Sequence, residues 1–269
     1  MQAPEVLGII AGSGVYPLRL AQAARAAGAQ RIVAVAFNGE TDPHLADRVD
    51  GIEWMRVGQL SHMVGSLRDA GVREAIMAGQ IAPKNLFDLR PDWKALLLLA
   101  KLPRRNAESI FGAIANELAA AGITLLPATT FLENDLAPKG LIAGRRLSRR
   151  QEEDVRFGFA LAKELSRLDI GQTIVVKNGT TLAVEAFDGS NATIRRGAAL
   201  AGKEAVVVKV SKPNQDMRFD VPVVGAETIR VAAEAQVRVL ATEAGRTLLL
   251  DRAAVVDAAE SAGISLVGV

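Results

Sequence analysis

The stretch Val6–Pro17, which reads VLGIIAGSGVYP, decides the fold prediction for this chain. It opens with the apolar run Val6–Ile10, which is typical of a buried strand. The turn Gly12-Ser13-Gly14 follows, and Pro17 then stands where the first turn of a helix accepts proline. A strand, a glycine-rich turn and a helix start in this order indicate a fold in which parallel strands alternate with helices.

The same alternation continues through the first half of the chain. Glycine ends several of the helical patterns, which suits a residue that tolerates left-handed backbone. We therefore expect a mostly parallel sheet with helices on both faces, as in a Rossmann-like domain. The predicted strands are Val6–Ile10, Arg31–Phe37, Glu74–Ala78 and Ile123–Leu126, and the predicted helices are Leu18–Ala27, Gln59–Ala70 and Ser109–Ala121.

The second half changes character after a break. Residues 134–150 hold proline, glycines and four arginines, which predicts a linker. Further on, Asn178-Gly179 lies between two β-rich runs and is a strong hairpin signal. We predict two α/β domains, residues 1–135 and residues 136–269. The elements expected in the second are the helices 149–165, 192–201, 228–235 and 252–262 and the strands 172–177, 180–186, 205–210, 237–240, 247–250 and 264–267.

Composition narrows the chemistry that the chain can perform. With 269 residues, 49% hydrophobic and 23% charged, it reads as a soluble globular protein. It has no cysteine, which excludes disulfides, thiolate metal sites and thiol nucleophiles. Its two histidines, His44 and His62, are not spaced for one helix face, so we expect any metal to be a hard cation on oxygen ligands, such as magnesium.

Net charge and hydropathy limit the classes of partner that the protein can bind and its expected location in the cell. The net charge of +2 is compatible with an anionic substrate or membrane surface. An aromatic content of 4% offers no stacking platform for nucleic acid. We find no secretion signal and no apolar stretch of about 18 residues, so we expect no membrane span and a cytoplasmic location.

Two glycine-rich loops in the first half are candidate binding elements. Backbone N–H groups of the Gly12-Ser13-Gly14 turn and the following helix start suit a phosphate. The turn resembles a dinucleotide fingerprint whose third glycine is replaced by Pro17, so NAD binding is the minor alternative. Gly79-Gln80 ends another strand and could share the same crevice, or Gly79 could simply permit a turn.

Polar segments of the second half form another candidate group. Residues 169–172 (Asp-Ile-Gly-Gln) precede a strand, and residues 189–196 open a helix. Ser190 or Asn191 could simply cap that helix. However, Arg195 and Arg196 would oppose the helix dipole in its first turns, which an anionic partner would offset. Glu185 adds a carboxylate nearby.

The loop Lys212–Gly225 is the most distinctive polar segment. Pro213 and Pro222 exclude a helix interior and a central strand. Asp220 is suited to ligating magnesium or orienting a water molecule, and Lys212 and Arg218 to neutralising phosphate oxygens. The structural alternative is an ion pair that joins Asp216 or Asp220 to a cation.

The run Trp93–Arg105 is the most apolar segment and is flanked by cations. It could lie on a membrane surface or line an acyl-chain pocket. A buried helix or a subunit contact is the alternative.

Taken in order, these segments resemble the LpxI-type UDP-2,3-diacylglucosamine pyrophosphatases of lipid A biosynthesis. No segment is specific alone, but together they span the chain. One departure is Asn191, where some relatives carry aspartate. The segments are Leu7–Gly14 with Pro17, Ala78-Gly79, Leu168–Gln172, Ala183–Ala186, Gly189–Arg196 and Lys212–Pro222.

The resemblance implies a metal-dependent hydrolase with its site in a cleft between the two domains. Water attacks the α-phosphorus of UDP-2,3-diacylglucosamine, giving UMP and 2,3-diacylglucosamine 1-phosphate (lipid X). It implies Asp220 as the catalytic residue, and Asp220 with Glu185 as ligands of Mg²⁺ or another divalent cation such as Mn²⁺. The substrate-binding residues expected are Gly12, Ser13, Gly14, Gly79, Gln80, Asp169, Gln172, Asn191, Thr193, Lys212, Gln215 and Arg218.

The resemblance also carries expectations about partners. It implies a homodimer that contacts the inner membrane peripherally on its cytoplasmic face. For a diacyl substrate, two interpretations of Leu96–Leu99 are equally supported: these residues contact lipid, or they are buried in the protein. The alternative from another functional class is a non-catalytic carrier or sensor of a nucleotide-linked lipid.

Overall fold

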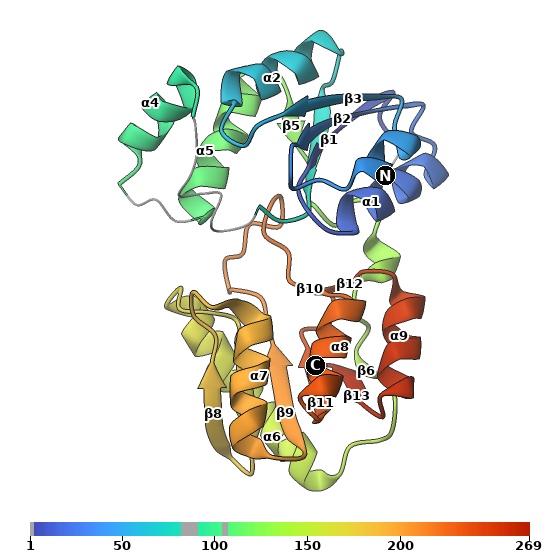
Figure 1. Cartoon of the computed structure of the whole chain (residues 1–269), viewed down its shortest axis with the longest axis vertical. Coiled ribbons are helices and arrows are strands. Elements are labelled where there is room, and N and C mark those ends of the chain that lie inside the picture. Colours follow the sequence, from blue (N-terminus) through green and yellow to red (C-terminus); the bar gives the residue numbers. More distant parts are fainter. Residues whose placement is uncertain (1–2, 82–90, 104–106) are drawn as a thin grey trace. The chain divides into compact units, whose positions relative to one another are not determined.

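The computed structural model in Figure 1 describes residues 3–81, 91–103 and 107–269. The chain forms two compact units. Unit 1 is Met1–Glu133 with Asp216–Asp220, and unit 2 is Asn134–Gln215 with Val221–Val269. The sequence placed the whole loop after Lys212 in the second domain, whereas the contacts of Asp216–Asp220 assign these five residues to unit 1.

Unit 1 is built on a parallel sheet. In its described residues the strand order is β3-β2-β1-β4-β5, and every neighbouring pair is parallel. The order therefore reverses between β1 and β4, which is the switch point where doubly wound sheets bind ligands. Its elements are β1 Val6–Ala11, α1 Tyr16–Ala26, β2 Arg31–Phe37, the 3₁₀ helix η1 Pro43–Arg48, β3 Gly51–Met55, α2 Leu60–Asp69, β4 Glu74–Ala78, α4 Trp93–Lys101, α5 Ala107–Ala120 and β5 Thr124–Leu125.

Apolar residues on both sides of these strands explain the two helical layers. Val33, Val35 and Phe37 of β2 project into a core shared with α2 and α5. The alternate residues Ala34 and Ala36 are also fully buried, because α1 covers the opposite face (Figure 1). The sequence predicted every strand of this sheet except β3, whose short and half-buried pattern gave no clear signal.

Unit 2 is built on a mixed sheet. In its described residues the order is β6-β13-β11-β9-β7-β8; β13, β11 and β9 run parallel, and the remaining pairs are antiparallel. The elements are β6 Gly140–Ala143, α6 Arg149–Arg167, β7 Thr173–Lys177, β8 Thr180–Val184, α7 Gly189–Ala201, β9 Ala205–Lys209, β10 Val223–Val224, α8 Ala226–Glu234, β11 Val237–Thr242, β12 Leu248–Leu249, α9 Arg252–Ser261 and β13 Ser265–Gly268, with the 3₁₀ turn η2 Glu133–Asp135 at the boundary.

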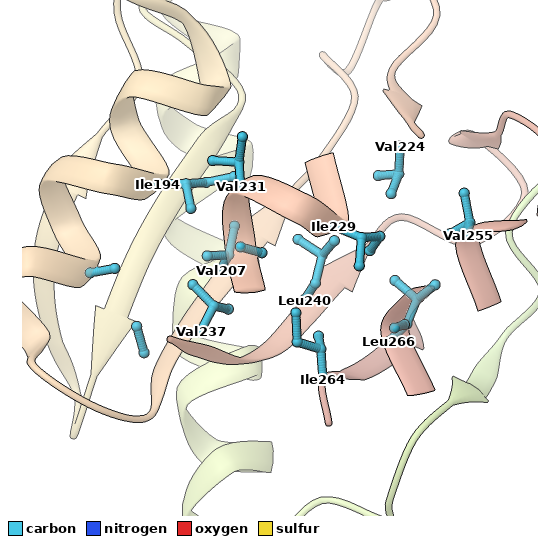
Figure 2. Close-up of a cluster of buried hydrophobic side chains, with 14 of the residues drawn as sticks. Ile194, Val207, Val224, Ile229, Val231, Val237, Leu240, Val255, Ile264 and Leu266 are labelled. Carbon is cyan, nitrogen blue, oxygen red and sulfur yellow. The ribbon is translucent and has the colours of Figure 1, made fainter. Parts of the chain in front are cut away.

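Strand alternation divides the core of unit 2 into two halves. Val206 and Val208 of β9 pack in the cluster that includes Val155 and Ala162 of α6. Val207 points to the other face, into the cluster that α7, α8 and α9 complete (Figure 2). This is the period-two pattern of a strand that is buried on both faces.

Two local predictions for unit 2 meet different outcomes. The Asn178-Gly179 hairpin is confirmed, since both residues have positive φ and the flanking strands β7 and β8 are antiparallel. The linker predicted over residues 134–150 is wrong in part, because Gly140–Ala143 pairs with β13 as an edge strand. This strand has only four residues and is partly exposed, so its hydrophobic pattern is too short to predict a strand.

No helix in the described ranges is long and apolar enough to cross a membrane. Of the apolar run Trp93–Arg105, the part up to Lys101 forms α4, whereas Arg104 and Arg105 lie outside the described residues.

Substituting Gly197 in α7 tests how tightly this helix packs on the sheet. A Cβ there would lie 2.5 Å from the Cβ of buried Val175, a stiff side chain that cannot move aside. Gly197→Ala should lower the unfolding free energy by roughly 1–2 kcal/mol, because overpacking outweighs the gain in helix propensity. Gly65→Ala in α2 is the matched control, since its Cβ meets nothing within 4 Å and should stabilise by up to about 1 kcal/mol. Urea unfolding of both variants measures the difference, and equal effects would contradict the packing argument.

Candidate active site

The two glycine-rich loops of unit 1 meet at the switch point. Gly12 follows β1 and Gly79 follows β4, and the loops form an antiparallel bridge between Ser13 and Gln80. The Ser13 N–H donates to the Gln80 carbonyl at 2.7 Å, and the Ser13 hydroxyl donates to the same oxygen at 2.9 Å. The two loops therefore stand side by side as predicted, but both donors of Ser13 serve the contact between them.

Glycine is required on both sides of this contact. A Cβ on Gly12 would lie 2.5 Å from the Gln80 carbonyl oxygen. Gly79 has a φ of +93°, and a Cβ there would lie 2.6 Å from the Ser13 carbonyl oxygen. The glycines at 12 and 79 thus permit the close approach of two backbones, whereas Gly14 has open space around it and a positive φ.

Tyr16 makes a long-range contact that the sequence does not predict. Its hydroxyl donates to the Ala128 carbonyl at 2.5 Å, which ties the start of α1 to the segment after β5. Burial raises the pKa of Tyr16 well above its ordinary value, so the hydroxyl remains a donor at neutral pH. Tyr16 and Ala128 are 112 positions apart, so no local sequence pattern predicts the hydrogen bond between them.

The segment Asp216–Asp220 is anchored to unit 1 beside the carboxyl end of its sheet. The Ala128 N–H, three residues beyond β5, donates to the Met217 carbonyl at 2.7 Å. The Phe219 ring lies 5.7 Å from the Phe111 ring of α5 and packs against the core of unit 1. Asp220, the next residue, is half-buried and donates its N–H to the Asp216 carbonyl at 3.1 Å.

An ion pair shapes the same segment from within. The Arg218 guanidinium donates to both carboxylate oxygens of Asp216, at 2.9 and 2.6 Å. These hydrogen bonds hold the pKa of Asp216 below its ordinary value. The guanidinium carbon also lies 5.9 Å from the ring centroid of Phe219. Asp216 thus forms the ion pair of the structural alternative, and Arg218 is its partner; the substrate-binding role of Arg218 stays a prediction.

Strand register gathers the polar segments of unit 2 at one edge of its sheet. Thr173 at the start of β7 pairs with Lys209 at the end of β9, so the residues before 173 and after 209 are neighbours. The Val210 N–H donates to the Gln172 carbonyl at 2.9 Å, and the Lys212 ammonium pairs with the Asp169 carboxylate. Asp169, Gln172 and Lys212 are therefore brought together, as their common assignment to substrate binding expects.

Glu185 lies at the same edge and is buried. Its carboxylate accepts hydrogen bonds from the Ser190 hydroxyl at 2.9 Å and from the Gln172 N–H at 3.3 Å. Gly171 cannot carry a side chain, because its Cβ would lie 2.1 Å from the Glu185 carbonyl oxygen. The side-chain oxygen of Gln172 is buried and accepts no hydrogen bond from the described residues, which leaves one oxygen available to a cation or donor near Glu185.

The helix after Glu185 corrects one sequence argument. α7 begins at Gly189, with Asp188 at the N-cap, so Ser190 and Asn191 lie inside its first turn rather than capping it. Arg196 lies two turns along and pairs with Asp188 at 2.9 Å, which offsets the charge of Arg196 within the helix itself. The sequence predicts a helix only from residue 192, because Gly189 and Ser190 are weak helix formers.

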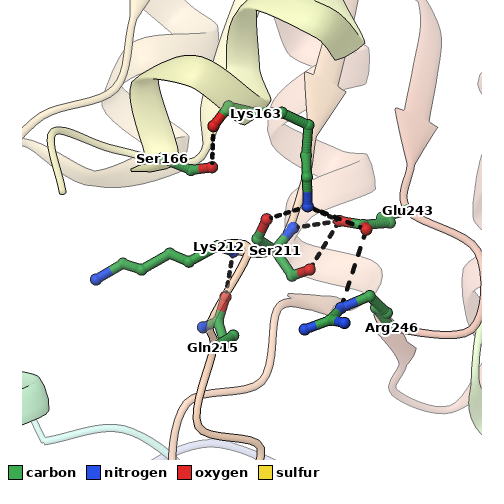
Figure 3. Close-up of polar contacts among 7 residues, drawn as sticks. All are labelled: Lys163, Ser166, Ser211, Lys212, Gln215, Glu243 and Arg246. Carbon is green, nitrogen blue, oxygen red and sulfur yellow. Dashed lines mark hydrogen bonds and ion pairs between the residues drawn. The ribbon is translucent and has the colours of Figure 1, made fainter. Parts of the chain in front are cut away.

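The predicted substrate residues of α7 and of the loop differ in accessibility. Thr193 is fully buried, and its hydroxyl donates to the Gly189 carbonyl at 3.0 Å inside the helix, whereas Asn191 is half-buried. Gln215 is buried, and its side-chain oxygen accepts the Lys212 N–H at 2.6 Å (Figure 3). Gln215 therefore shapes the start of the loop.

The described residues contain no group of three or more His, Asp or Glu side chains arranged to hold a metal. Asp220 and Glu185, the predicted metal ligands, belong to unit 1 and unit 2 respectively. A magnesium ion commonly uses one or two protein carboxylates, with water and substrate phosphates as its other ligands, so it does not require such a group.

These features define an α/β protein with a Rossmann-like unit and a second α/β unit, each with polar residues at one edge of its sheet. Comparison with known proteins gives the family: the chain belongs to the LpxI family, because residues 6–134 match the LpxI N-terminal domain and residues 138–267 match the LpxI C-terminal domain. The resemblance stated from the sequence is confirmed.

A characterised relative extends over the same length. The UDP-2,3-diacylglucosamine pyrophosphatase LpxI of Caulobacter vibrioides is 32% identical over 274 residues, which cover 98% of this chain and 97% of the relative. Both domains are therefore shared from end to end.

Two solved structures show a distant likeness. The biotin carboxylase domain of a thermophilic 2-oxoglutarate carboxylase, bound to ADP, is 14% identical with a TM-score of 0.30, over 64% of this chain and 34% of that chain. The biotin carboxylase subunit of a pyruvate carboxylase is 16% identical with a TM-score of 0.28, over 67% of this chain and 35% of that chain. The chain spans about a third of the length of these structures, and scores at this level carry no functional argument.

The Asp216–Arg218 pair predicts a pH-dependent contribution to stability. Because the folded-state pKa of Asp216 is lowered, the pair stabilises the fold above the unfolded pKa of about 3.9 and loses that effect as pH falls through the folded pKa. At pH 7 Asp216→Asn should lower the thermal midpoint by no more than about 2–4 °C, since the pair is partly exposed and contributes at most about 1 kcal/mol.

The gap between wild type and Asp216→Asn should close between about pH 5 and pH 2, which thermal melts across that range measure. Arg218→Gln is the matched variant, because it removes the cation that lowers the Asp216 pKa and should give the same closing gap. A gap that stays constant over this range for both variants would contradict the prediction.

Proposed function

We propose that this protein hydrolyses the pyrophosphate bond of UDP-2,3-diacylglucosamine. The observation that carries the proposal is the end-to-end similarity to a relative named as that pyrophosphatase, at 32% identity over 98% of the chain. The site supports it, because each unit presents polar residues at one edge of a sheet, where α/β proteins bind ligands. The absence of cysteine does not oppose it, since phosphoryl transfer requires no thiol.

The reaction forms one bond and breaks one. A water oxygen attacks the α-phosphorus, and the bond from that phosphorus to the bridging oxygen breaks. The products are UMP and 2,3-diacylglucosamine 1-phosphate, and the bridging oxygen leaves with the latter. In this proposal Asp220 holds the attacking water or takes its proton, since the anchored segment offers a half-buried carboxylate beside the carboxyl end of the sheet of unit 1.

A divalent cation, Mg²⁺ or Mn²⁺, fits the residues present and is part of the proposal. It would neutralise charge on the phosphate oxygens. The candidate ligands are Asp220 in unit 1 and, in unit 2, Glu185 with the buried side-chain oxygen of Gln172. These are hard oxygen donors of the type that magnesium prefers.

Substitution of Asp220 tests the proposal directly. Asp220→Asn keeps the size of the side chain but removes its charge, and should lower turnover by about 10²–10⁴-fold. The measurement is UMP release from purified protein with Mg²⁺ and UDP-2,3-diacylglucosamine. Asp69→Asn, which removes an exposed carboxylate of the same unit, is the matched control and should keep wild-type turnover.

Each outcome of this experiment separates the hypotheses. Near-normal turnover in Asp220→Asn would remove Asp220 from the mechanism while leaving the activity in place. If wild-type protein binds the substrate but releases no UMP under any divalent cation, the protein is a carrier or sensor of the nucleotide-linked lipid.

The proposal extends to lipid contact through α4. This helix exposes Trp93, Leu96 and Leu97 by 72%, 58% and 46%, three positions on one helical face. Its other side is held to unit 1, since Ala95 is buried and Lys94 pairs with Glu117 of α5 at 2.6 Å. An apolar helical face with a tryptophan and a flanking lysine is typical of contact with a lipid interface.

Two charge substitutions test that contact. Leu96→Glu with Leu97→Glu should weaken binding to phosphatidylethanolamine–phosphatidylglycerol vesicles by at least about tenfold, because each buried leucine contributes roughly 1.5–3 kcal/mol. Co-sedimentation with the vesicles is the measurement. Leu200→Glu on α7 is the matched control, since Leu200 is 69% exposed and should not matter. Equal binding by all three proteins would exclude α4 as the contact.

A peripheral position on the cytoplasmic face of the inner membrane and a homodimeric state complete the proposed function. Light scattering of the purified protein measures the oligomeric state, and cell fractionation with a salt wash measures the membrane association.

A further inference from the structure

A partly buried ion pair in unit 2 lies at the start of the loop that leads to Asp220. Glu243 follows β11, and Lys163 projects from α6; their side chains are 13% and 25% exposed. The Lys163 ammonium donates to both carboxylate oxygens of Glu243 at 3.1 Å (Figure 3). Neither residue carried a signal in the sequence, because the two are 80 positions apart.

The pair binds every polar group of one residue, Ser211. Its N–H and its hydroxyl both donate to Glu243 at 2.7 Å, and its carbonyl accepts from Lys163 at 2.7 Å. Ser211 is fully buried and lies two residues beyond the end of β9, immediately before the loop. These three hydrogen bonds fix both the position and the orientation of the backbone as it leaves the sheet.

The far end of the loop is held as well. The Lys209 ammonium, on the last residue of β9, donates to the Val223 carbonyl at 3.1 Å. The Leu248 N–H donates to the Pro222 carbonyl at 2.9 Å. The loop Lys212–Gly225 therefore starts and ends at points fixed to the sheet of unit 2, whereas its middle part, Asp216–Asp220, belongs to unit 1.

A contribution to overall stability does not by itself explain this arrangement. Removing two charges even partly from water costs free energy, and apolar replacements of buried pairs are often as stable. Burial raises the pKa of Glu243, but the hydrogen bonds from Ser211 and Lys163 outweigh it and hold the pKa below its ordinary value, so the group is charged at neutral pH. Arg246 also lies 3.9 Å from the Glu243 carboxylate (Figure 3), but the distinctive property of the pair is that it binds the backbone and hydroxyl of Ser211.

We propose that Glu243 and Lys163 are positioning residues that fix the start of the loop and thereby place Asp220 for the reaction. The proposal rests on the proposed function, because it assigns a role in turnover through Asp220. A displacement of about 1 Å at a reacting group can lower turnover by about 100-fold, so a fixed loop origin affects the reaction strongly.

Glu243→Gln tests the proposal, because it keeps an acceptor for Ser211 but removes the charge that Lys163 requires. We expect kcat to fall by about 10- to 100-fold with KM within about twofold of wild type, measured at 15 °C and corrected for the folded fraction by circular dichroism. Trypsin should also cut the Arg218–Phe219 bond at least about tenfold faster, since the loop leaves its place more often. Glu227→Gln, which breaks an exposed pair with Arg230 on α8, is the matched control and should change neither quantity.

Ser211→Ala is the second variant, and it decides the question if Glu243→Gln does not fold. It removes one of the three hydrogen bonds that Ser211 makes with the pair and should change both quantities in the same direction by a smaller factor. A kcat within twofold of the Glu227→Gln control in the folded variants overturns the proposal. If wild-type protein releases no UMP, the proposed function has failed, and the tryptic rate alone then decides whether the pair holds the loop.

Discussion

Burial of the strands on both faces is the constraint on which the arrangement of this molecule depends. Polar side chains cannot stand in the middle of such strands without a cost of roughly 1–3 kcal/mol each, so they collect where the strands end. Strand pairing then brings such ends together at one edge of the sheet. In unit 1 the parallel pairing of β1 and β4 places Gly12 beside Gly79, and in unit 2 the antiparallel pairing of β7 and β9 places Gln172 beside Val210. The polar chemistry of each unit follows from strand register before any single contact is considered.

The fold was largely predictable from the sequence because its signals are local. A run such as Val6–Ile10 is read from neighbouring residues, and the structure contains it as β1. The hairpin at Asn178-Gly179 is likewise determined by two adjacent residues with positive φ. Elements with weak local signals were missed: β3 is half-buried, and β6 is a four-residue edge strand whose partner, β13, lies more than 100 residues away.

The candidate site divides in the same way. Segments that combine glycine with polar residues stood out, and Asp169, Gln172 and Lys212 are indeed neighbours. What holds these segments was not predictable, because it depends on contacts between distant residues. In the sequence Phe219 is an aromatic residue between two charged residues, and only the structure shows that its ring packs against Phe111. Local patterns thus identify groups that are suited to chemistry, whereas the long-range packing that orients them requires the structure.

The ion pairs that Lys212 and Arg218 form are compatible with phosphate binding, because both pairs are partly exposed to solvent. Lys212 and Arg218 each face a carboxylate, but all four side chains are partly exposed. Pairs in such positions contribute only about 0–1 kcal/mol, so an anionic substrate can compete for these cations at small cost. The pair of Glu243 and Lys163 is also partly exposed, but it differs because both of its side chains also bind Ser211 at the origin of the loop. The loop therefore combines exchangeable charges along its length with a fixed charge at its origin, which is the division expected of a segment that must bind a phosphate while keeping one carboxylate in place.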